Sequence, residues 1–172
     1  FPNGLQSIQK GAFQNCSELR AISLPNTVTT LGESAFENCN NVKNLSLSGS
    51  LTELPNLAFY GCGISDLCIP DSVTQIGVET FSNCSSLSAV QLSRNLKTIS
   101  HSAFYNCEEL KSISFPTGLE TIGEAAFAQT ALGSISLPDT LTELGQAAFY
   151  NIPQLKFAKI PGSLKTIPRS AF

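Results

Sequence analysis

The sequence has no tryptophan, no methionine and one histidine, and only 13% of its 172 residues are charged. The lone histidine, His101, has no second histidine, positioned nucleophile or carboxylate cluster to join, so we expect no catalytic triad and no metal site. A net charge of −3 provides no basic field for a nucleic-acid backbone, and we expect no nucleic-acid partner. No apolar run reaches the roughly 20 residues of a membrane helix, so we expect no membrane insertion by this segment.

The sequence also lacks an initiating methionine, a signal-peptide charge pattern and polar capping units at either end. It begins at Phe1-Pro2, which aligns with the apolar-proline pair Leu24-Pro25, and it stops at Phe172 inside a repeat. Solenoid arrays normally finish in polar caps. We therefore expect residues 1–172 to be a single array that is a fragment of a longer one and lacks both caps.

The sequence does contain a phenylalanine every 22 or 23 residues, usually preceded by alanine. These phenylalanines are Phe13, Phe36, Phe59, Phe81, Phe104, Phe127, Phe149 and Phe172. A period in the twenties means that each unit is one coil, which cannot bury its own apolar face and must stack on its neighbours. The spacing therefore predicts a solenoid of about seven and a half repeats.

Each repeat includes a short segment in which apolar and small polar residues alternate, as in a strand with one buried face. The segments are 19–25, 42–48, 64–70, 87–93, 110–116, 132–138 and 155–161. Because every coil returns the chain in the same direction, we expect one continuous parallel sheet with about 4.8 Å between neighbouring strands.

Two apolar columns follow each strand, three residues apart, and predict a second buried side of the coil. The first is Leu5, Val28, Leu51, Val73, Leu96, Leu119, Leu141 and Leu164, and the second is Ile8, Leu31, Leu54, Ile76, Ile99, Ile122, Leu144 and Ile167. Glycine or proline often comes next, which predicts a turn into a short helical segment. Two repeats lose one residue, after Cys62 and after Thr130, where we expect a loop.

Five of the six cysteines occupy one column, three residues after the repeat phenylalanine: Cys16, Cys39, Cys62, Cys84 and Cys107. The distance between stacked rungs would permit disulfides. However, five cysteines cannot all pair, and threonine or isoleucine takes this place in two repeats, so we expect buried free thiols. The sixth, Cys68, occupies an outward strand position and should be exposed.

The consensus Leu-x-x-Ile-x-Leu-Pro, followed by Leu-x-x-Ile-Gly-x-x-Ala-Phe-x-x-Cys, resembles the BspA-like class of leucine-rich repeats over the whole chain. The resemblance implies a right-handed leucine-rich-repeat solenoid with a parallel sheet on its concave face and short helical turns or short strands on its other sides. It also implies a secreted or surface-exposed protein of bacteria or protozoan parasites that adheres to host matrix or cell-surface proteins. It carries no catalytic, cofactor-binding or metal-binding residue over to this chain.

The open face of the predicted sheet is the first candidate contact surface. It is mostly serine and other small residues, which suits an extended protein or a glycan, although it lacks the aromatic and arginine anchors of a tight interface. The candidate protein-binding residues are Ser23, Ser46, Asp66, Cys68, Gln91, Ser114, Ser136, Phe157 and Lys159. A basic segment without acids overlaps its end and consists of Lys156, Phe157, Lys159, Lys165 and Arg169.

All three tyrosines, Tyr60, Tyr105 and Tyr150, directly follow a repeat phenylalanine on alternate rungs, roughly 10 Å apart by the strand spacing. Such a row can anchor a partner, or each ring can simply cover the neighbouring rung. The sequence does not decide between the sheet face and this row.

These features together predict a non-enzymatic module, extracellular or at the cell surface, that adheres to proteins through its sheet face. Two alternatives stay open. The array could be a structural spacer that projects another domain, or the recognition domain of an enzyme whose catalytic part lies outside residues 1–172.

Overall fold

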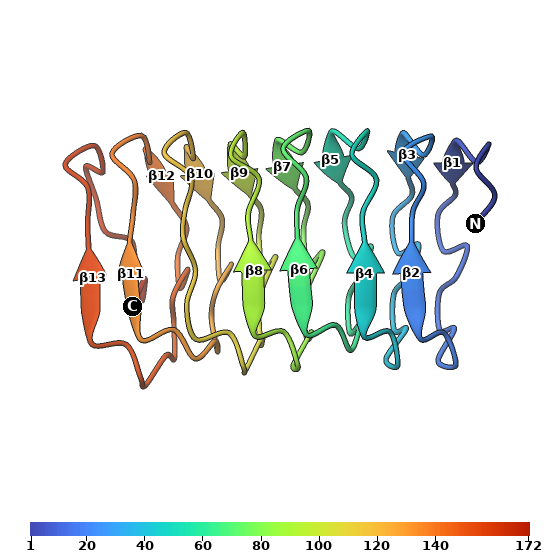
Figure 1. Ribbon diagram of the computed structural model, residues 1–172. Coiled ribbons are helices and arrows are strands. Elements are labelled where there is room, and N and C mark those ends of the chain that lie inside the picture. The colour runs from blue at the N-terminus through green and yellow to red at the C-terminus, as the bar shows by residue number, and fades with distance from the viewer.

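The chain is wound into an elongated solenoid of stacked coils, and the computed structural model describes all residues 1–172. Every paired strand is parallel and there is no helix. In Figure 1 the chain rises along the front strands, crosses to the short back strands and advances from the N-terminus toward the C-terminus, which is a right-handed coil as predicted.

Six of the seven predicted front strands are confirmed, each at the centre of its predicted segment. They are β2 (Ala21–Ser23), β4 (Asn44–Ser46), β6 (Asp66–Cys68), β8 (Ala89–Gln91), β11 (Ser134–Ser136) and β13 (Phe157–Lys159). Residues 112–114 lie at the place of the seventh but pair with no strand.

The prediction of one continuous front sheet is wrong, because the front strands stand in pairs (Figure 1). β2 pairs with β4, β6 with β8 and β11 with β13, whereas β4 and β6 are not hydrogen-bonded and residues 112–114 are bonded to neither neighbour. The three junctions at which neighbouring front strands are hydrogen-bonded, here called closed, join strands 23 residues apart. The two junctions between strands 22 residues apart have no such bonds and are called open. The missing residue lies just before the front strand, so a short coil displaces that strand from its neighbour. The junction between β8 and residues 112–114 is open at full spacing, which nothing in the local sequence explains.

The back of the coil consists of two-residue strands that end in the second apolar column. They are β1 (Ser7–Ile8), β3 (Thr30–Leu31), β5 (Glu53–Leu54), β7 (Gln75–Ile76), β9 (Thr98–Ile99), β10 (Thr121–Ile122) and β12 (Glu143–Leu144). β1 pairs with β3, and β5 to β12 form a five-stranded sheet that stays paired across both short coils. The column prediction fails at Ile167, which is 56% exposed because residues 165–167 pair with no strand.

The predicted short helical segment is wrong, because successive turns occupy the third side of the coil. Alternate amides bond to the next rung, as Phe36 N donates to Ala58 O at 2.9 Å. The amides between them close turns within their own coil. For example, Ala35 N donates to Gly32 O at 3.2 Å. With half of the amides used between rungs, no continuous helical ladder can form. Each coil also places two residues at positive φ, such as Ser34 and Asn38.

Asparagine recurs one residue before the cysteine column, at Asn15, Asn38, Asn83, Asn106 and Asn151. It suits the second positive-φ position of each coil, because asparagine tolerates the left-handed region better than most residues. Asn38 and Asn106 have a φ of 58°. Where two asparagines are adjacent in the column they also bond to each other: Asn106 Nδ2 donates to Asn83 Oδ1 at 2.9 Å. Asparagine pairs therefore bridge adjacent rungs where the column is uninterrupted.

The eight repeat phenylalanines form one continuous stack through the core. Neighbouring rings lie 5.1 to 5.7 Å apart and within 16° of parallel. Phe1 and Phe115 pack edge-on against this stack, on Phe13 and Phe127 respectively. The stack and the apolar columns form a single core cluster, so each coil is stabilised mainly by its two neighbours.

The cysteine column lies beside the phenylalanine stack. All six cysteines are free thiols, and Cys39, Cys62, Cys84 and Cys107 are buried as predicted. Each buried thiol donates to the carbonyl of a phenylalanine on the preceding rung at 3.2 to 3.3 Å. Cys16 is exposed, against the prediction, because in the structure no rung packs over the N-terminal side of its coil.

Candidate functional site

The front face of the array is hollowed. A cavity of about 690 Å³ opens along it and is lined by five successive rungs, from β2 to residues 112–114. The outward side chains of these rungs are small or polar, so they leave the hollow instead of filling it. The face is concave over these rungs, as expected for the sheet side of the coil.

All nine predicted contact residues are exposed on this face. Six of them line the hollow: Ser23, Ser46, Asp66, Cys68, Gln91 and Ser114. The other three, Ser136 on β11 and Phe157 and Lys159 on β13, lie on the same face beyond the hollow. The structure therefore brings two thirds of the predicted contact residues into one concave site. The role of this site in binding stays a prediction.

The lining also includes residues outside the predicted set, among them Lys43, Leu45, Val90 and Ile113. Lys43 directly precedes its strand, at a position we did not count as part of the face. Leu45, Val90 and Ile113 occupy the inward position of the alternating pattern, which normally means burial. They are only half-buried here, and nothing in the alternation could have shown it.

Two charged residues of the hollow have no ion-pair partner. Asp66 accepts a hydrogen bond from Ser65 Oγ at 2.6 Å, and Lys43 is not part of any ion pair. The four ion pairs of the molecule lie elsewhere: Lys10 with Glu33, Arg94 with Asp71, Lys97 with Glu120 and Lys111 with Glu109. Opposite charges are thus available to a partner on adjacent rungs.

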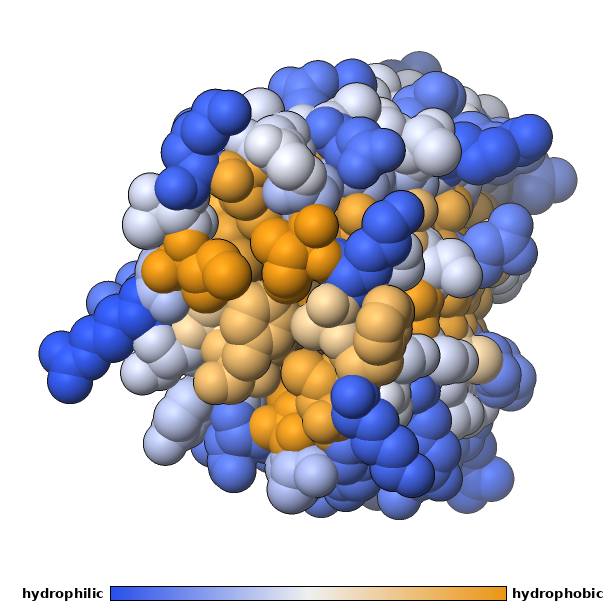
Figure 2. Space-filling view, turned by 90° about the vertical axis from the view of Figure 1, so that its left-hand side faces the viewer, coloured by the Kyte–Doolittle hydropathy of each residue, from blue (hydrophilic) through white to orange (hydrophobic).

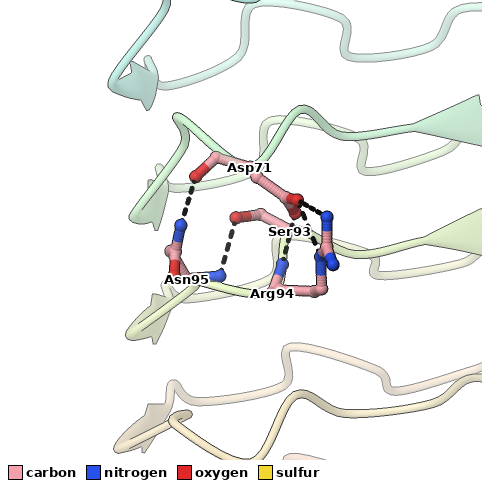
Figure 3. A network of polar contacts seen from close by, with 4 residues as sticks. All are labelled: Asp71, Ser93, Arg94 and Asn95. Atoms are coloured by element: carbon pink, nitrogen blue, oxygen red, sulfur yellow. Dashed lines mark hydrogen bonds and ion pairs between the residues drawn. The ribbon is translucent and has the colours of Figure 1, made fainter.

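A polar network in the turns after β6 and β8 joins two coils, as Figure 3 shows. The Arg94 guanidinium lies 2.6 Å from Asp71 Oδ2, and Arg94 N donates to Asp71 Oδ1 at 2.8 Å. Asn95 Nδ2 donates to Asp71 O at 2.8 Å, and Asn95 N donates to Ser93 Oγ at 3.1 Å. The hydrogen bond from Arg94 holds the pKa of Asp71 below its usual value. Because the Asp71 oxygens and the Ser93 hydroxyl are engaged within the protein, this network fixes a turn and offers no reactive group.

Three of the four buried thiols, those of Cys62, Cys84 and Cys107, are not reactive sites either. Burial raises the pKa of Cys84 to about 12 and raises that of Cys107 as well. The neighbouring Cys39 thiol, together with burial, raises the pKa of Cys62. A thiol held protonated is a poor nucleophile and a poor metal ligand. No group of three or more histidine, cysteine, aspartate or glutamate side chains could hold a metal ion, and no helix could cross a membrane.

The predicted tyrosine row lies on the turn side of the coil, away from the hollow. Tyr60 and Tyr105 are half-buried, and Tyr150 is 50% exposed. The intervening rungs carry the buried residues Ser82 and Ala128 at the same position. The row is therefore an interrupted set of partly covered rings, and its use as a contact surface stays a prediction.

The C-terminal end of the array is apolar. Figure 2 shows hydrophobic residues gathered there inside a hydrophilic border. Phe172 is the last ring of the stack and Ile167 the last member of the second apolar column, and both are exposed. Of the predicted basic segment, Lys156, Lys159, Lys165 and Arg169 are exposed and form no ion pair. The patch is the end of the core columns, and a hollow of about 430 Å³ beside it is lined by β10, β12 and residues that include Leu164, Lys165 and Pro168.

The sequence matches a family described as the BspA type leucine rich repeat region, over residues 1–63 and 52–172. No curated protein sequence matches significantly.

Among solved structures, a leucine-rich repeat protein from Bacteroides ovatus is 29% identical, with a TM-score of 0.58 over 91% of this chain and 53% of that one. A leucine-rich repeat protein from T. pallidum is 25% identical, with a TM-score of 0.63 over 92% of this chain and 64% of that one. A leucine rich cell surface protein from Faecalibacterium prausnitzii is 24% identical, with a TM-score of 0.56 over 98% of this chain and 64% of that one. The chain thus spans between half and two thirds of the length of these structures.

Proposed function

The chain belongs to the BspA-type leucine-rich repeat family, and from this premise we propose that it is a non-enzymatic module that adheres to proteins through its hollowed sheet face. The proposed location is extracellular or at the cell surface, as the family resemblance implies. The proposed partners are host matrix or cell-surface proteins.

The observation that carries the proposal is the hollow of about 690 Å³ on the front face. It is a concave surface whose lining side chains are held on successive rungs of a rigid stack, and it contains two charged groups without ion-pair partners, Lys43 and Asp66. The buried thiols and the Asp71 network have their polar groups engaged within the protein, and the hollow of the back sheet, lined by β10, β12 and residues 164–168, is smaller at about 430 Å³. A solenoid of this kind presents such an extended concave face for binding.

The test measures binding of the purified chain to an immobilised basement-membrane extract and to cultured epithelial cells. The key variant changes Ser46, Gln91, Ser114 and Ser136 to glutamate. A matched variant adds the same four charges to exposed positions on the back of the coil, at Ser7, Thr30, Gln75 and Thr166. A third variant changes the three tyrosines to serine.

Saturable binding that is lost only in the front-face variant supports adhesion through the sheet. Loss only in the tyrosine variant would transfer the contact surface to the tyrosine row. An absence of saturable binding by the unmodified chain, with its circular dichroism intact, would contradict the adhesion proposal and favour the spacer alternative.

A further inference from the structure

The charges of the molecule are unevenly distributed between its sides. The front face consists of the two outward residues of each front rung and the residue before them, since Lys43 and Ser88, at that preceding position, line the hollow. These positions hold five of the ten basic residues of the chain but only one of its thirteen acidic residues. The basic residues are Arg20, Lys43, Lys111, Lys156 and Lys159, and the acidic residue is Asp66. The front face is therefore positive although the chain has a net charge of −3.

Most of these basic side chains have no acidic partner in the protein. Only Lys111 forms an ion pair, with Glu109 at 3.2 Å. The exposed cations without an ion pair are Arg20 and Lys43 at one end of the face and Lys156 and Lys159 at the other. Cations on a concave surface attract ligands of the opposite charge and set their orientation. The distribution therefore favours an extended anionic ligand that runs along the array.

The floor of the hollow narrows the class of ligand. Leu45, Val90 and Ile113 line the hollow and are only half-buried, whereas Ile22 and Leu67 at the same position are 1% and 3% exposed. No aromatic side chain lines the hollow. Single-stranded nucleic acids bind by stacking their bases on aromatic rings, and a sulfated polysaccharide has no apolar side chains to cover such a floor. An apolar floor between two basic ends favours a polypeptide with acidic and apolar side chains.

We propose that the front face binds an extended acidic polypeptide that also carries apolar side chains. The apolar side chains cover Leu45, Val90 and Ile113, and the carboxylates bind the cations at both ends of the hollow. Asp66 is the one unfavourable charge along this path; it lies in the hollow and accepts a hydrogen bond from Ser65 Oγ at 2.6 Å. The proposal rests on the proposed function and specifies the chemistry of its protein partner.

The first test compares polymers of matched length on the immobilised chain by biolayer interferometry. A random copolymer of glutamate and tyrosine should bind saturably. Polyglutamate should bind at least about fivefold more weakly because it has no apolar side chains, and a copolymer of lysine and tyrosine should not bind. A smaller difference for polyglutamate, binding of the lysine copolymer, or no binding of the glutamate–tyrosine copolymer would overturn the proposal. Heparin that binds as tightly as the glutamate–tyrosine copolymer would overturn the choice of a polypeptide.

Two matched double variants locate the surface. The first changes Arg20 and Lys43 to glutamate, and the second makes the same change of charge at Lys10 and Lys97, away from the front face. Lys10 and Lys97 are exposed and each forms one exposed ion pair, which contributes little to stability, so the control should fold. Binding of the glutamate–tyrosine copolymer should weaken by at least about tenfold in the first variant and stay within about twofold in the second. Equal losses, or retention in both variants, would contradict the assignment to the front face.

Asp66 provides a test with the opposite sign. Asp66→Asn removes the unfavourable carboxylate and should tighten binding of the glutamate–tyrosine copolymer by at least about threefold. Asp139→Asn makes the same change at an exposed residue without an ion pair outside the face and should leave the affinity nearly unchanged. Weaker binding by Asp66→Asn, or equal gains in both variants, would count against the proposal.

Salt supplies an independent check. Raising NaCl from about 0.1 M to about 1 M shortens the screening length from about 10 Å to about 3 Å, and the copolymer should then bind at least about tenfold more weakly. An unchanged affinity would refute the role of the cations. Binding to the basement-membrane extract that survives while the glutamate–tyrosine copolymer fails would overturn this inference alone and leave the adhesion proposal standing.

Discussion

The substitution Phe81→Ala tests the core that holds the hollow in place. Phe81 is fully buried, and its ring lies between Phe59 at 5.5 Å and Phe104 at 5.4 Å. Removing the ring forfeits the burial of a large side chain, about 1.5–3 kcal/mol, and two stacking contacts of about 0.5–1.5 kcal/mol each. The cavity term brings the expected loss of unfolding free energy to about 3–5 kcal/mol, the usual range for buried phenylalanine.

The assay is urea denaturation followed by circular dichroism, with Phe172→Ala as the matched control. Phe172 stacks on a single neighbour, Phe149, and is 41% exposed, so its loss should be clearly smaller than that of Phe81. Because neighbouring coils stabilise each other, the loss at Phe81 should also weaken amide protection most in the coils next to it. A loss below about 1 kcal/mol for Phe81→Ala, or a loss equal to that of Phe172→Ala, would refute the stacked-core reasoning.

Three further predictions address the turns, the thiols and one carboxylate. A Cβ added at Gly145 would lie 2.2 Å from a backbone nitrogen of the preceding rung, whereas one added at Gly133 meets nothing within 4 Å. Alanine should therefore lower the melting temperature markedly at Gly145 and little at Gly133, and equal shifts would contradict the close packing of rungs. A thiol-specific reagent should label Cys16 and Cys68 in the folded chain and the other four cysteines only after unfolding; labelling of more than two thiols in the native state would mean that the column is open. The pKa of Asp71 is lowered by the neighbouring guanidinium, so the stability from this pair is present above the pKa of the unfolded state and lost as the pH falls through the lower folded-state value. Asp71→Asn should therefore lower the melting temperature slightly near neutral pH and not at about pH 2, and an equal effect at both would refute the ionic role.

Most of the coil architecture could be predicted from the repeat alone. The interval between phenylalanines, the alternating segments and the two apolar columns predicted stacked parallel strands, and six of seven front strands formed where expected. One failure, the expected short helical segment, occurred where hydrogen bonding between rungs competes with local preference. The segment after the glycine column forms turns instead of a helix because alternate amides, such as that of Phe36, bond to the next rung.

The candidate site was predictable in part. Alternation identified which side chains face outward, and all nine predicted contact residues are exposed on one face. Alternation could not show that Leu45 and Val90, at inward positions, would be half-exposed. Their exposure depends on whether the next strand closes against them, which is a property of two adjacent coils and not of either sequence segment.

The sequence by itself determined the solenoid, the direction of its strands and the identity of its open face, because a short repeat allows only one way for every apolar column to be buried. Only the tertiary structure decided where the front sheet opens. The missing residues after Cys62 and Thr130 were visible in the sequence, but the back sheet stays paired across both short coils and the front sheet does not. How that displacement is divided between the two faces depends on the packing of whole coils against each other, and that division leaves the front sheet unpaired at both short coils.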